Sequence, residues 1–198
     1  MFSYGTGTTV NISDSTITTT ADNSGGIQTT GGGTMNAELT ANNSEALVIE
    51  GKNSIALTNC TVSGNMSSTK GSSSSENVHT VMIYQSMSGD ADVGTSEFSM
   101  TGGSLTGKNG DLFYITNTHC ILTLSGVTLK NGSTFTGTIN IADNAEGGTA
   151  VSDNAVVTIG SGCTWTLTGD CTITSLTNNG TINFNGHTIT LADGTVLR

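Results

Sequence analysis

Hydroxyl side chains recur at one place of a repeated pattern and could bind a polar surface. The chain contains an eight-residue repeat four times: VNISDSTI from Val10, IALTNCTV from Ile55, FSMTGGSL from Phe98 and LTLSGVTL from Leu122. Its seventh place holds Thr16, Thr61, Ser104 and Thr128. Copies stacked about 4.8 Å apart would align these hydroxyls in a row that could bind a polysaccharide or order water at an ice surface. The alternative is that β-branched Thr simply suits an exposed strand.

Two aspartates could bind a divalent cation. Asp90 and Asp92 lie two residues apart in the stretch SGDADVG. Calcium prefers carboxylate and carbonyl oxygens supplied by loops, so we expect a calcium site here. Asp143 with Glu146, and Asp153, are weaker candidates. The alternative is that all of these acids are solvated turn residues.

The histidines do not form a catalytic pattern. His79, His119 and His187 lie far apart in the sequence, and no GxSxG motif is present. Pectin-active β-helix enzymes use clustered carboxylates with Arg or Lys beside the acidic sugar. Here the first arginine is Arg198. We therefore expect a protein that is not an enzyme.

The cysteines fit a protein core better than a metal site. Cys60 occupies the sixth place of the repeat, which is expected to face inward, and Cys120 precedes another copy. Cys163 and Cys171 flank a turn, and they could form a disulfide or occupy two inward positions on adjacent sides. No spacing resembles a zinc site.

The repeat itself predicts how these residues are positioned. Apolar or small residues stand at places one, three, six and eight, whereas strict alternation in a strand would put places three and six on opposite faces. A corner between them resolves this conflict, and the fifth place holds residues that tolerate positive φ: Asp14, Asn59, Gly102 and Gly126. The pattern thus predicts an all-β parallel solenoid of about nine coils, with roughly 22 residues in each.

Other segments extend the same coils. Apolar runs at 47–49, 81–84 and 112–115 are expected to form another side, and a weak copy of the repeat begins near Met35. We expect one domain over residues 1–198, with an irregular insertion around 66–97 and shorter closing coils over 157–198.

Composition excludes several partners. The 198 residues carry a net charge of −10 with only five Lys and Arg, which argues against nucleic-acid binding. No apolar run is long enough to cross a membrane, so no membrane insertion is expected. The first ten residues lack a signal peptide. We expect an extracellular or bacterial cell-surface segment of a longer protein; its oligomeric state stays open.

Two stretches resemble known proteins. The tail WTLTGDCTITSLTNNGTINFNGHTITL resembles the closing coils of right-handed β-helix proteins from anaerobic bacteria, including clostridial extracellular carbohydrate-binding domains and adhesins. LTLSGVTL and IALTNCTV are similar to the pectate-lyase-type right-handed helix in general. The resemblance implies a single-stranded right-handed parallel β-helix that binds plant-type polysaccharide without catalysis, with calcium in some members. A structural stalk in a large surface protein is the alternative function, and ice binding is the third.

Overall fold

The computed structural model describes two sets of residues. It gives the backbone of 2–3, 15–19, 27–29, 33–35 and 37–42, and the backbone and side chains of 44–71, 76–89, 91–126, 132–142 and 146–198. The described chain is built of β-strands, with a single short 3-10 turn at Thr69–Gly71. No helix in these ranges is long and apolar enough to cross a membrane.

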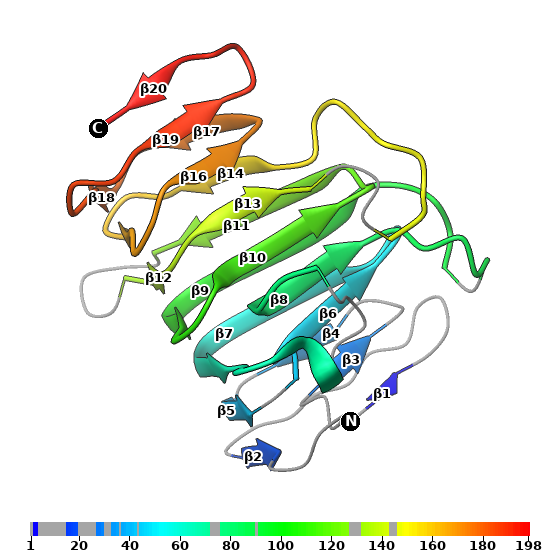
Figure 1. Ribbon diagram of the computed structural model, residues 1–198. Coiled ribbons are helices and arrows are strands. Elements are labelled where there is room, and N and C mark those ends of the chain that lie inside the picture. Colours follow the sequence, from blue (N-terminus) through cyan, green and yellow to red (C-terminus); the bar gives the residue numbers. More distant parts are fainter. Residues whose placement is uncertain are drawn as a thin grey trace.

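The strands form three parallel ladders, which the chain visits in turn (Figure 1). The first ladder contains β1 (Phe2–Ser3), β3 (Ile27–Thr29), β6 (Leu47–Glu50), β8 (His79–Tyr84), β10 (Asp111–Thr116), β13 (Ile139–Ile141), β16 (Cys171–Ile173) and β19 (Ile189–Leu191). The second contains β4 (Gly33–Met35), the first halves of β7 (Ser54–Asn65) and β9 (Ser96–Gly107), β11 (Cys120–Ser125), β14 (Val156–Ile159) and β17 (Ser175–Asn178). The third contains β2 (Ser15–Thr19), β5 (Ala37–Asn42), the second halves of β7 and β9, β12 (Thr134–Thr136), β15 (Thr164–Thr166) and β18 (Thr181–Asn183).

The repeat stacks in the predicted register. Ile55 of β7 pairs with Phe98 of β9, which pairs with Leu122 of β11, so the first places of three copies are aligned. The corner inside β7 and β9 falls at the fifth place, where Asn59 has φ 52° and Gly102 has φ 69°. These positive φ angles turn the strand so that both halves face one interior.

Two details of the repeat differ from expectation. Gly126 does not adopt positive φ, and β11 ends one residue before it, at Ser125. The weak copy is displaced: Gly33 pairs with Ile55, so Met35 stands at the third place and not the first. The apolar run 81–84 lies in strand β8, on another side of the coils as expected. Asp14 lies outside the described residues.

The interior is a continuous column of apolar side chains. Ile49, Ile83 and Ile115 stand in register in the first ladder and are fully buried. Phe98, Phe113 and Phe135 contact one another across the interior, with ring centroids 5.0 to 6.0 Å apart. Each coil needs only a narrow core because its neighbours cover it above and below.

The architecture is therefore all-β, parallel and solenoid-like. Nine coils are not confirmed: of the nine strands in the sheet of the first ladder, β20 (Val196–Leu197) pairs antiparallel with β19. This antiparallel strand covers the edge of β19 at the carboxyl-terminal end of the ladder (Figure 1).

Candidate functional site

The third ladder carries two outward rows of hydroxyl side chains, here called the hydroxyl face. Strand alternation points residues one and three of each short strand outward and the middle residue inward. The first row reads Thr61, Ser104, Thr134, Thr164, Thr181, and the second reads Ser63, Thr106, Thr136, Thr166, Asn183. Their side chains are exposed or half-buried. In backbone register, Thr16 and Glu38 extend the first row and Thr18 and Thr40 extend the second.

The structure brings together three of the four predicted hydroxyl residues. Thr16, Thr61 and Ser104 share the first row, which Glu38 interrupts between Thr16 and Thr61. Thr128 lies outside the described residues. The position beside Ser104, which the repeat predicted for Thr128, is occupied by Thr134. The later part of the row was missed, although the triplets TFT, TWT and TIN of β12, β15 and β18 repeat the same polar–apolar–polar pattern.

Buried residues hold this face in place. The middle residues Val62, Leu105, Phe135 and Trp165 are each 1% exposed or less. The Trp165 Nε1 also donates a hydrogen bond to the main-chain oxygen of Gly137 at 3.0 Å. The packed inner side therefore fixes the spacing of the outer hydroxyls.

The hydroxyls of the face make few side-chain bonds within the described part of the chain. Within the described residues one bond between side chains links two neighbours of the second row at its end, from Asn183 Nδ2 to Thr166 Oγ1 at 3.2 Å. Ser104, Thr134 and Thr164 make no side-chain bond to another described residue, so each can donate and accept. The face has no exposed aromatic platform in this part of the chain, since Trp165 and Phe135 are fully buried.

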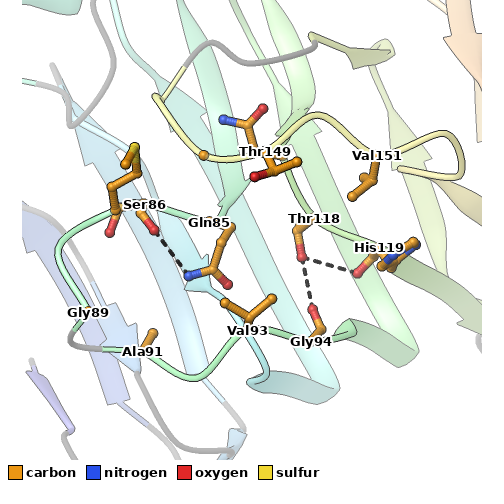
Figure 2. A pocket seen from close by; sticks show the side chains of 13 residues that line it. Gln85, Ser86, Gly89, Ala91, Val93, Gly94, Thr118, His119, Thr149 and Val151 are labelled. Carbon is orange, nitrogen blue, oxygen red and sulfur yellow. Dashed lines mark hydrogen bonds between the residues drawn. The ribbon is translucent and has the colours of Figure 1, made fainter.

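A pocket of about 360 Å³ lies at the corner between the first and second ladders (Figure 2). Three successive loops converge on it: 85–94 after β8, 117–119 after β10, and 148–151 before β14. Gly148 packs so closely on the first two that an added Cβ would lie 2.6 Å from Gln85 O and 3.1 Å from the Asn117 Cβ. The pocket thus belongs to the irregular interval between Ile55 and Phe98, together with loops from the next two coils.

The predicted calcium ligands are not assembled in the described residues. Asp90 lies outside them. Asp92 is exposed, and its main-chain oxygen accepts a hydrogen bond from Lys52 N at 2.7 Å. No group of three or more His, Cys, Asp or Glu side chains gathers anywhere in the described ranges. Calcium binding therefore stays a prediction.

Each histidine has an acidic neighbour from a distant segment, which sequence spacing could not show. His79 Nε2 lies 3.3 Å from Glu45 Oε1 with both side chains buried. His119 Nδ1 lies 2.5 Å from Asp153 Oδ1 with both about half exposed. His187 Nδ1 lies 3.8 Å from Asp170 Oδ1.

The cysteines are free and buried, so the Cys163–Cys171 pair occupies two inward positions and forms no disulfide. Burial raises the pKa of the Cys120 thiol well above its ordinary value, and Glu97 adds to this by charge repulsion. Burial also raises the pKa of Cys171 to about 12, against a smaller lowering by the Ile139 N–H. Such thiols are inert at neutral pH.

Comparison with protein-family models, curated proteins and solved structures found no match to this chain. The resemblance to clostridial β-helix domains therefore stays a prediction, as do the non-enzymatic character and the surface location. What bears on function is the geometry of the hydroxyl face and of the corner pocket.

Proposed function

We propose that this chain is a non-catalytic binding module that holds an extended polysaccharide or cell-surface glycan along the hydroxyl face. The observation that carries this proposal is the pair of parallel hydroxyl rows running through β7, β9, β12, β15 and β18. A glycan chain lying along the solenoid axis would meet equivalent donors and acceptors on every coil. The chain fits an extracellular or cell-surface setting, with binding and not catalysis as its task.

The charge of the protein favours a neutral glycan. A net charge of −10 with five basic residues repels acidic sugars unless a divalent cation bridges them. Calcium held near Asp90 and Asp92 would supply such a bridge, and it forms part of the proposal for anionic glycans only.

Retention on insoluble polysaccharides tests this function. The unmodified chain is incubated with cellulose, xylan and pectin, with and without calcium, beside a T134V/T164V variant of the face. The control is T123V/T158V, which removes two hydroxyls from the outward row Ala56, Ser99, Thr123, Thr158 and Thr177 of the second ladder. We expect retention on at least one polymer that the face variant loses and the control keeps. Absence of retention on every polymer would contradict the proposal.

Ice binding is the second candidate, because the structure makes the hydroxyl rows more regular than the four repeat copies indicate. Five successive strands place Ser or Thr in the first row, and four of them do so in the second. Regular hydroxyl rows with no exposed aromatic side chain among the described residues suit ordered water as well as sugar. Thermal hysteresis of a solution of the chain would favour ice binding. A stalk role predicts neither polymer retention nor thermal hysteresis.

We also propose that the solenoid is right-handed with about nine coils. The resemblance of the tail supports this, as does the strong preference of parallel crossover connections for the right-handed sense. An experimental structure of the chain would test both features.

A further inference from the structure

The corner pocket combines features that the solenoid does not need. Its volume of about 360 Å³ falls in the range of small-molecule sites. The loops that line it come from three coils, and Figure 2 shows their side chains arranged around one hollow. The loop 117–119 is long enough to connect two ladders at this corner. The longer loop 85–94 is therefore not needed for the connection alone.

One buried polar group in the lining has an unmet hydrogen bond. Gln85 is 6% exposed, and its Nε2 donates to the main-chain oxygen of Ser86 at 3.2 Å. Its Oε1 is buried without a donor and lies against Gly51. A buried acceptor left without a donor is energetically unfavourable. This unpaired acceptor belongs to a residue that lines the pocket.

A second polar group is oriented by its partner. His119 lines the pocket, and its Nδ1 is engaged by Asp153 Oδ1. A carboxylate at Nδ1 favours the tautomer that leaves Nε2 as an acceptor. Thr118 Oγ1 donates a hydrogen bond to the main-chain oxygen of Gly94 at 3.1 Å, which links the 117–119 loop to the 85–94 loop.

The rim of the pocket is apolar and exposed. Met87 is 79% and Val93 is 82% exposed, and both lie on the 85–94 loop. Val151 faces the same hollow from the third loop (Figure 2). Large apolar side chains exposed beside convergent polar groups are typical of a ligand site.

We propose that this pocket binds a single neutral sugar unit, such as a chain end or side branch, at a site separate from the hydroxyl face. The C–H face of the sugar packs on Val93 and Met87, and its hydroxyls donate to His119 Nε2 and towards Gln85. The choice of a sugar as the ligand rests on the proposed function, which is glycan binding.

Binding is measured by NMR titration of the ¹⁵N-labelled chain with the methyl glycosides of glucose, galactose, mannose and xylose. We expect at least one glycoside to shift the amide signals of the 85–94, 117–119 and 148–151 loops in a saturable way. V93D and H119A should each weaken this binding about tenfold or more, a change equivalent to about 1.4 kcal/mol. V196D is the matched control, since Val196 is also exposed and lies on β20.

Two results would overturn the proposal: no glycoside shifts these loops, or V93D binds as V196D does. The two sites are separated by the T134V/T164V variant. It should lose retention on polymer and keep glycoside binding. V93D should keep most of the retention, because chain ends are few relative to the length of polymer chain, and should lose glycoside binding. Unchanged retention of the T134V/T164V variant on polymer would therefore contradict the proposed function. It would not contradict sugar binding in the pocket.

Discussion

Thr134 of β12 lies directly beside Ser104 of β9 in the sheet, and Thr164 of β15 lies on its other side. The three hydroxyls come from separate coils, yet the parallel register places them one strand spacing apart. We expect retention on polysaccharide to fall stepwise in T134V, T134V/T164V and T106V/T134V/T164V. Each lost hydroxyl should cost roughly 0.5–1.5 kcal/mol of binding, which depletion isotherms on the retaining polymer measure.

Valine keeps the shape and the strand preference of threonine, so these variants should unfold at the same denaturant concentration as the original chain. Loss of stability in step with loss of retention would mean that the rows are structural, and would count against a binding face.

The repeat predicted this architecture because each copy carries the residues that must be buried at the same places. Ile55, Phe98 and Leu122 stack as expected since one face of each strand must enter the core. The position of Thr134 could not be predicted, because β11 ends at Ser125 and no local pattern of the sequence specifies that the third ladder continues with β12 from Thr134. The pocket could not be predicted from the sequence either, because Gln85, His119 and Val151 come from three loops on different coils and line one pocket only in the folded chain.

Gly103 should tolerate no side chain. It has φ 82°, and an added Cβ would lie 2.0 Å from Cys60 O on the neighbouring coil. G103A should therefore lower the free energy of unfolding in urea by more than about 2 kcal/mol, beyond the cost of the left-handed backbone alone.

Gly186 is the matched control for this prediction. It has φ 83°, and nothing lies within 4 Å of an added Cβ. G186A should lower the free energy of unfolding by about 1 kcal/mol, because only the cost of the left-handed backbone applies there. Equal costs at both positions would show that β7 and β9 do not approach each other as closely as described.

Trp165 reports on the integrity of the core, since it is the only tryptophan in the chain and is fully buried. Its native fluorescence should be blue-shifted and resistant to acrylamide, and both properties should disappear in one transition on unfolding. W165A should cost roughly 3–5 kcal/mol by opening a cavity and by removing the bond to Gly137 O. Strong quenching in the native state would contradict burial of the indole.

The buried thiols predict loss of stability at alkaline pH. The pKa of Cys171 is about 12 in the folded chain, against an ordinary 9.0. Above pH 9.0 the unfolded chain releases a proton that the folded chain retains, so the free energy of unfolding falls as pH rises from 9.0 towards about 12. Urea unfolding at stepped pH should show a steeper alkaline decline for the original chain than for C171A, by up to about 1.4 kcal/mol per pH unit. Identical slopes would contradict burial of this thiol.

Two histidine–carboxylate pairs should contribute very differently to stability. His79 and Glu45 are 0% and 3% exposed, and the imidazole also stacks on Tyr114 with ring centroids 5.2 Å apart. Removal of the carboxylate leaves the buried imidazole without this hydrogen-bond partner, so E45A should lower the free energy of unfolding by about 1–3 kcal/mol. His119 and Asp153 are 48% and 53% exposed, and D153A should change the free energy of unfolding by less than about 1 kcal/mol. Urea unfolding of E45A, D153A and the original chain at neutral pH measures both effects. A cost for D153A as large as that for E45A would show that the loop carrying Asp153 is anchored by this pair, and would contradict a solvent-exposed pair at the pocket rim.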